Sequence, residues 1–149
     1  MQETRDFFLD TYSSITETDI ESLLFSLRLG DRIFLIGDLG SGKSTLARAL
    51  LRRHLENPSL IVRSPTYTYY QRYTSDNSLI PEVYHFDLYR VESNADLFLI
   101  GAMDILEDPM SICIIEWPEL LPEAVIPTRK IHITPSKTGR DYRIETRWF

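Results

Sequence analysis

A glycine-rich segment with one lysine and a following serine carries the clearest chemistry in this sequence. Residues 37–44 read Gly-Asp-Leu-Gly-Ser-Gly-Lys-Ser and match the pattern G-x-x-x-x-G-K-[ST]. Glycines allow backbone torsions that side chains forbid, so successive N–H groups can point at one anion. Lys43 would reach the outer phosphates, and the Ser44 hydroxyl would ligate magnesium. The pattern therefore predicts a site for a nucleoside triphosphate with Mg²⁺.

Two carboxylates farther along the chain could provide a second anchor for the metal, usually found at the end of a neighbouring strand. Glu116 follows the apolar run Ile112–Ile115, which favours a metal site over a plain ion pair. Asp87 and His85 would share one face of an extended strand. For Asp87, a metal-site role and an arginine partner are about equally supported. His85 is more typical of a hydrogen-bonded structural histidine than of a base.

Three other features leave two interpretations open. The hydroxyl-rich segment Ser64–Thr68 could order around a terminal phosphate, as switch loops do, or form a plain turn. Arg48, Arg52 and Arg53 could form a basic patch, although a solvated helix face is the more frequent outcome. Cys113 alternates with apolar neighbours, which favours packing in the core.

The phosphate loop needs a buried strand before it and a helix after it. Arg32–Ile36 is a short β-branched run with turn residues on both sides, which predicts that strand. From Lys43 to Glu56 the apolar spacing is helical, and Asn57-Pro58 ends the helix. Both flanks of the loop are therefore what phosphate binding requires.

The rest of the chain predicts an α/β fold with a mixed central sheet flanked by helices and a late hairpin. Thr18 is a plausible N-cap for a first helix. Elsewhere the patterns predict helices over 18–29 and 94–106, strands over 60–62, 67–73, 83–90 and 111–116, and a hairpin formed by 130–134 and 141–146.

The composition is that of an ordinary soluble protein. Of 149 residues, 43% are hydrophobic and 26% charged, which fits one domain spanning residues 1–149. The net charge of −6 disfavours a stand-alone nucleic-acid binder. The single cysteine forms no intramolecular disulfide. The first residues lack a secretory signal, and no apolar run approaches the roughly 18 residues of a membrane span. We therefore expect a cytoplasmic protein without membrane contact.

Four motifs occur in an order that is typical of one protein family. They are Gly37–Ser44, Ser64-Pro65-Thr66-Tyr67-Thr68, His85-Phe86-Asp87-Leu88-Tyr89-Arg90 and Ile115-Glu116-Trp117-Pro118. In this order the chain resembles the bacterial TsaE family, also called YjeE. The resemblance implies a small P-loop ATPase of the cytoplasm that serves in making threonylcarbamoyladenosine in tRNA. Its implied partners are TsaB and TsaD, with tRNA met indirectly through that complex.

The resemblance also implies roles for individual residues. Lys43, Thr66, Asp87 and Glu116 would serve hydrolysis, while Ser44 and Glu116 would hold Mg²⁺. The catalytic base stays open among Asp87, His85 and a water held by Thr66. The stretch Thr16–Thr18 resembles a nucleotide-contacting segment. ATP would be bound by Asp38, Leu39, Gly40, Ser41, Gly42, Lys43, Ser44, Thr45 and Trp117.

Two other functions compete with the ATPase. A small-molecule kinase usually carries an arginine-bearing lid that excludes water, and residues 94–106 contain no arginine. A nucleotide-dependent binding module would use the segment around Thr66 as a switch, with hydrolysis incidental.

Overall fold

One seven-stranded sheet organises the molecule, with strand order β1-β7-β6-β2-β5-β4-β3. The computed structural model describes residues 7–65 and 67–147. Neighbours among β6, β2, β5 and β4 are parallel, whereas β1–β7, β7–β6 and β3–β4 are antiparallel. The predicted α/β fold with a mixed sheet is therefore confirmed. The strands are β1 (Phe7–Ile15), β2 (Arg32–Ile36), β3 (Tyr70–Tyr73), β4 (Val83–Asp87), β5 (Cys113–Glu116), β6 (Arg129–Pro135) and β7 (Arg140–Arg147).

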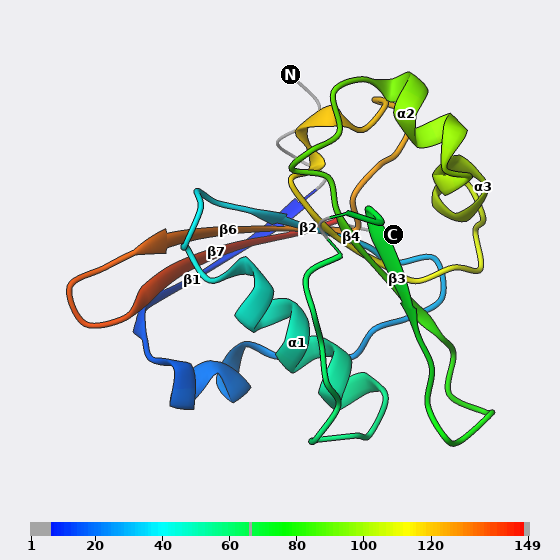
Figure 1. The fold of residues 1–149 in the computed structure, drawn as a ribbon. Coiled ribbons are helices and arrows are strands. Elements are labelled where there is room, and N and C mark those ends of the chain that lie inside the picture. Colours follow the sequence, from blue (N-terminus) through cyan, green and yellow to red (C-terminus); the bar gives the residue numbers. More distant parts are fainter. Residues whose placement is uncertain (1–6, 66, 148–149) are drawn as a thin grey trace.

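Helices cover both faces of this sheet (Figure 1). Helix α1 (Lys43–His54) and the 3₁₀ helix η2 (Glu17–Leu23) lie on one face, and α2 (Asn94–Leu99) and α3 (Ala102–Leu106) lie on the other. A short 3₁₀ turn, η3 (Pro118–Leu120), follows β5. Two apolar clusters match these layers, because one contains the buried leucines of α1 and the other those of α2 and α3. Layers of this kind fix the strand ends from which a site can be built.

The alternation of β2 shows how the sequence selects its two faces. Ile33 and Leu35 are fully buried in the α1-side cluster with Leu46 and Leu50. Phe34 lies between them in sequence and belongs to the opposite cluster. Side chains of a strand alternate between faces, so the central residues of a strand with helices on both sides are apolar on both faces. This double burial anchors β2 directly before the phosphate loop.

The first predicted helix is wrong in type and extent. Residues 18–29 do not form an α-helix; the 3₁₀ helix η2 ends at Leu23, and its N-cap is Thr16 instead of Thr18. Leu24 is extended, with ψ 148°. Leu27 is nonetheless buried in the α1-side cluster. The leucines whose spacing predicts a longer helix are therefore buried by tertiary packing without forming that helix.

The predicted helix over 94–106 is also wrong as one element. Gly101 adopts φ 76°, a left-handed conformation that separates α2 from α3. Glycine reaches this conformation without a steric penalty. The break lets two short helices turn over the face of the sheet, where Leu97 and Leu106 are buried.

Several strands differ from their predicted bounds. No strand forms over 60–62, where Leu60 and Val62 pack on the core without a ladder partner. β3 starts only at Tyr70, because Tyr69 has φ 67°. The strands predicted over 83–90 and 111–116 are shorter, and the first helix after the loop ends at His54. β1 was not predicted, whereas the β6–β7 hairpin was.

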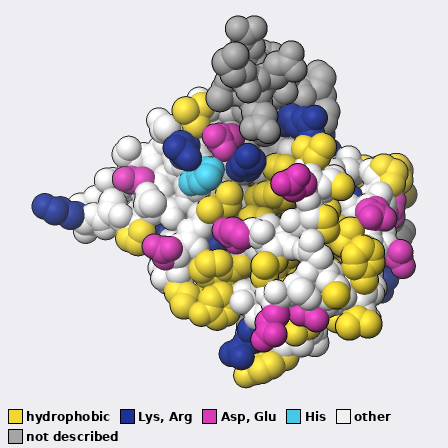
Figure 2. All heavy atoms as spheres, turned by 90° about the horizontal axis from the view of Figure 1, so that it is seen from above, with side chains coloured by type: hydrophobic (Ala, Val, Ile, Leu, Met, Phe, Trp, Pro, Cys, Tyr) yellow, Lys and Arg dark blue, Asp and Glu magenta, His cyan; other side chains and the backbone are white. Residues whose placement is uncertain are grey.

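The face of the molecule above α2 and α3 carries mixed charges (Figure 2). Acidic side chains are spread over it, whereas the basic ones are fewer and lie mostly outside its right-hand part, where several hydrophobic side chains gather. Phe98 and Leu99 of α2 are largely exposed. Within the described residues, no helix is long and apolar enough to cross a membrane.

Candidate functional site

The glycine-rich loop connects β2 to α1, as its sequence requires. Gly40 and Gly42 have φ 77° and 106°, torsions that other residues rarely adopt. A Cβ atom at Gly37 would lie 2.4 Å from Ser41 Oγ and 2.7 Å from the Ile133 carbonyl oxygen, so only glycine fits there. The loop therefore wraps tightly against β6 and turns into the N-terminus of α1, where backbone N–H groups and the helix dipole favour an anion.

Lys43 lies at the start of α1 and is 5% exposed. Its Nζ donates to the carbonyl oxygens of Gly37 and, at 3.0 Å, of Asp38. The same ammonium lies 3.9 Å from the ring centroid of Trp117. Burial lowers the pKa of Lys43, and the nearby carboxylate of Glu116 opposes that shift. A bound phosphate would supply the negative charge that this partly desolvated ammonium favours.

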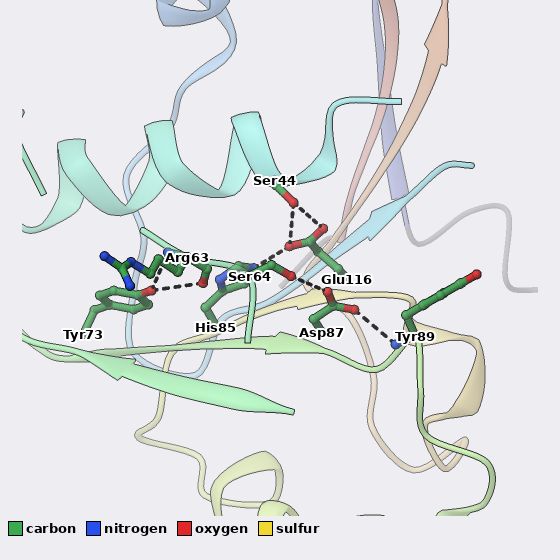
Figure 3. Close-up of polar contacts among 8 residues, drawn as sticks. All are labelled: Ser44, Arg63, Ser64, Tyr73, His85, Asp87, Tyr89 and Glu116. Carbon is green, nitrogen blue, oxygen red and sulfur yellow. Dashed lines mark hydrogen bonds and ion pairs between the residues drawn. The ribbon is translucent and has the colours of Figure 1, made fainter. Parts of the chain in front are cut away.

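Glu116 joins the loop to the end of β5 (Figure 3). It is 2% exposed, and its Oε1 accepts a hydrogen bond of 3.1 Å from Ser44 Oγ. Its Oε2 lies 2.6 Å from Nε2 of His85. Nδ1 of His85 is buried and has no hydrogen-bond partner among the described residues. Glu116 is therefore held from both sides by side chains of α1 and β4.

Asp87 lies beside Glu116, because the two residues are register partners in the parallel pair β4–β5. Asp87 Oδ2 accepts a hydrogen bond of 2.7 Å from Ser64 Oγ, and Oδ1 accepts one of 3.1 Å from the Tyr89 backbone N–H (Figure 3). Among residues 7–65 and 67–147, no arginine forms an ion pair with either carboxylate. The carboxyl ends of neighbouring parallel strands thus present two acids at one edge.

An aromatic pair borders the same edge. Trp117 follows Glu116 in a left-handed conformation, with φ 57°, which turns the chain sharply before η3. Its ring centroid lies 5.0 Å from that of Tyr89, and the planes are inclined at 45°. This pair gives the acidic edge an aromatic border beside the Lys43 ammonium.

These elements enclose a cavity of about 450 Å³. Most of the predicted site residues line it: the nucleotide-binding residues Leu39, Gly40, Ser41, Gly42, Lys43, Ser44, Thr45 and Trp117, and the acidic residues Asp87 and Glu116. Asp38 contributes its carbonyl to Lys43 but does not line the cavity. Thr66 lies outside the described residues. Sequence reasoning did not assign Tyr89, Arg90 or Arg140, which also line the cavity; for Arg140 no local pattern could have done so.

The donor set fits a magnesium ion that is shared with phosphates. Among the described residues, no group of three or more His, Cys, Asp and Glu side chains could hold a metal alone. Magnesium in nucleotide sites keeps several waters and takes only one or two protein ligands besides phosphate oxygens. The adjoining hydroxyl of Ser44 and carboxylate of Glu116 match that requirement.

The arginines of α1 belong to a second hollow, of about 370 Å³, between α1 and η2. Arg48 pairs with Glu17 at 3.3 Å, and Glu21 lines the same hollow. Arg48, Arg52 and Arg53 therefore share this hollow with acidic side chains and do not form a purely basic patch. Thr16 hydrogen-bonds within the same turn, to Asp19 at 2.7 Å.

Structural comparison shows a shared fold. YdiB of Bacillus subtilis superimposes with a TM-score of 0.61 over 95% of this chain and 88% of that chain, at 21% sequence identity. The likeness covers almost the whole chain and shows that the two proteins share an α/β fold.

Sequence comparison identifies the family. A protein of Haemophilus influenzae named tRNA threonylcarbamoyladenosine biosynthesis protein TsaE is 43% identical over 100 residues, covering 63% of this chain and 58% of that protein. A protein of the same name from Borreliella burgdorferi is 35% identical over 125 residues, covering 84% and 87%. The family model described as "Threonylcarbamoyl adenosine biosynthesis protein TsaE" matches residues 12–145. As the four motifs predicted, the chain belongs to the TsaE family.

Proposed function

We propose that this chain binds and hydrolyses ATP with Mg²⁺ in support of threonylcarbamoyladenosine synthesis in tRNA. The observation that carries the proposal is the contact of Ser44 with Glu116, 3.1 Å long, which joins the phosphate loop to a strand-end carboxylate. A hydroxyl and a carboxylate in this position are the protein ligands that P-loop enzymes give to magnesium. The family membership supports the pathway.

Each side chain has a separate task in this proposal. The loop N–H groups and Lys43 would hold the phosphates, and Ser44 and Glu116 would hold the metal, which supplies charge neutralisation when bound. Asp87 lines the cavity and would orient the attacking water through the carboxylate oxygens that Ser64 and Tyr89 already fix. His85 does not line the cavity and binds Glu116 instead, which favours a positioning role over that of a base.

The partners in this proposal are TsaB and TsaD, in the cytoplasm. The net charge of −6 and the mixed charges of the face in Figure 2 favour tRNA contact through those partners over direct binding. We expect slow hydrolysis by the chain alone and altered hydrolysis when partners and tRNA are added.

Replacement of Lys43 tests the site. We expect Lys43→Ala to lower ATP turnover by at least about 100-fold, since the cation that binds the outer phosphates is lost. Lys137→Ala is the matched control, because Lys137 is exposed in the hairpin turn, and it should retain full turnover. Unchanged phosphate release by Lys43→Ala would show that the site is misassigned. Reconstituted tRNA modification with TsaB and TsaD, with and without this chain, tests the pathway.

A nucleotide-dependent binding module is the second candidate. It is supported by the Ser64–Asp87 hydrogen bond, which connects the segment before Thr66 to the cavity. If Glu116→Ala abolishes hydrolysis yet sustains partner binding and tRNA modification, the switch function replaces the ATPase function. If modification falls together with hydrolysis, the ATPase proposal holds.

A further inference from the structure

Arg140 brings a cation to the phosphate loop from a distant part of the sequence. It is the first residue of β7 and pairs with Ile15 of β1 on one side and Pro135 of β6 on the other. The backbone at this point is therefore fixed between two strands. Arg140 lies two residues before Tyr142, which is buried in the α1-side cluster. The two side chains therefore lie on the same face of the sheet as α1.

The side chain of Arg140 packs directly against Gly42. A Cβ atom at Gly42 would lie 2.5 Å from Nε, 2.6 Å from Cζ and 2.7 Å from Cδ of Arg140. The guanidinium group thus occupies the space that any side chain at this loop position would need. Gly42 is also the N-cap of α1, where the loop N–H groups converge. The approach places a planar cation at the wall of the cavity.

Its charge has no acidic partner in the part of the chain that the structure describes. None of the ion pairs among those residues includes Arg140. It lies near Tyr142, whose pKa is raised by burial, a shift that Arg140 opposes. A half-buried guanidinium that lines a cavity and forms no ion pair with a described carboxylate is suited to phosphate, which it can bind through two parallel hydrogen bonds.

The order of the sheet determines which phosphates it would meet. β2, which leads into the loop, lies between β5 with Glu116 and β6 with the hairpin. If the proposed function holds, the metal and terminal phosphate lie toward Glu116 and Asp87. The inner phosphates then lie against the loop and helix N-terminus on the hairpin side, where backbone N–H groups cradle them. We propose that Arg140 binds the inner, α/β part of the nucleotide polyphosphate.

Binding of ADP and of ATP to the full chain, measured calorimetrically in the presence of Mg²⁺, tests this inference. Arg140→Met keeps most of the length of the side chain but removes its charge. It should lower the affinities for ADP and ATP by the same factor, about 10- to 100-fold. Arg140→Lys should recover part of the loss, because it restores charge without the bidentate fork. Arg143→Met is the matched control, since Arg143 is an exposed residue of the same strand on the opposite face; it should bind like the unaltered chain.

The outcomes separate this inference from the proposed function. The proposed function predicts that the unaltered chain binds both nucleotides and that Lys43→Ala does not. If Arg140→Met then binds both nucleotides normally, only the role of Arg140 is overturned. A loss confined to ATP would also overturn it, because it would place the arginine at the terminal phosphate. If Lys43→Ala binds like the unaltered chain, the proposed function fails first. A thermal melt would show whether Arg140→Met is folded. If it is not, Arg140→Lys decides: an equal loss of affinity for ADP and ATP supports the inference, and normal affinity contradicts it.

Discussion

The two sides of the cavity are built by different means. On the carboxylate side, formed by His85, Asp87 and Glu116, all three side chains are at least nine-tenths buried and hold one another or their neighbours by hydrogen bonds. On the hairpin side, formed by Arg140 at the start of β7, the cation is only half-buried, packs against Gly42 and interacts with Tyr142.

This difference indicates that the two sides contribute differently to turnover and to nucleotide affinity. Groups that are fixed before a ligand arrives need no rearrangement during reaction, and this preorganisation is what lowers a barrier. A single half-buried cation at the other side adds binding energy without ordering a network. We therefore expect changes on the carboxylate side to affect turnover more than affinity, and changes on the hairpin side to affect affinity.

The largest effect is expected from Glu116→Gln. The amide keeps the size of the side chain but removes the charge that would bind the metal, so turnover should fall by about 100- to 1000-fold. ADP affinity without Mg²⁺ should change by less than about threefold, because Arg140 and the loop remain. Phosphate release and calorimetry measure the two quantities. If ADP affinity fell by as large a factor as turnover, the carboxylate side would contribute to affinity as much as to turnover, and the two sides would not differ in role.

Asp87→Asn should lower turnover by about 100-fold, because an amide orients the attacking water less well than a carboxylate. The hydrogen bond from Ser64 can persist, since the amide oxygen still accepts. ADP and ATP affinities should stay within about threefold of the original. The prediction is contradicted if turnover is retained, in which case the water is held by another group.

His85→Leu should destabilise the chain, because Oε2 of the buried Glu116 loses its 2.6 Å partner and keeps only a 3.5 Å contact from Ser44 Oγ. The cost is expected to be about 1–3 kcal/mol, which lowers the Tm by roughly 3–10 °C for a chain of this length. His132→Leu is the matched control, since His132 pairs with Glu145 at 3.2 Å in a half-exposed position. It should lower the Tm by less.

A second variant separates positioning of Glu116 from general stability. His85→Gln offers an amide that can donate to Glu116, so it should recover part of the turnover lost in His85→Leu. If turnover is the same in His85→Leu as in the unaltered chain, His85 only fills space. Both measurements would be made well below the Tm of each variant.

The smallest effect is expected from Ser64→Ala. Its hydroxyl donates 2.7 Å to Asp87, and loss of one hydrogen bond of this kind corresponds to roughly a three- to tenfold fall in turnover. Affinity for ADP should not change. A fall in ADP affinity would instead mean that the segment before Thr66 contacts the inner phosphates.

The parts of this site that sequence could predict are those with local patterns. The loop lies between an apolar strand and an amphipathic helix, and Glu116 ends an apolar run, so spacing alone placed both at a sheet edge. The 3₁₀ turn η2 and the absence of a strand over 60–62 could not be predicted in the same way, because they depend on what the core accepts.

Long-range contacts explain the remaining differences. β1 forms because β7 offers an edge, and its own residues 7–15 carry no turn signal or strict alternation that would predict a strand. Arg140 follows an ordinary turn glycine, and nothing near it in sequence indicates Gly42. The partners of His85 and Asp87 were equally open, since a shared strand face does not specify what lies opposite.

The pairing of β1 with β7 also bears on the order of assembly. Ser14 donates to Asp141, a residue 127 positions further along the chain. Closing so large a loop costs entropy before any contact forms, and contacts of this span tend to form late in folding. The parallel strands β2, β5 and β4, which include Glu116, can pair by closing shorter loops. The strand ends that carry Asp87 and Glu116 would therefore be paired before β1 closes on β7, the strand that begins with Arg140.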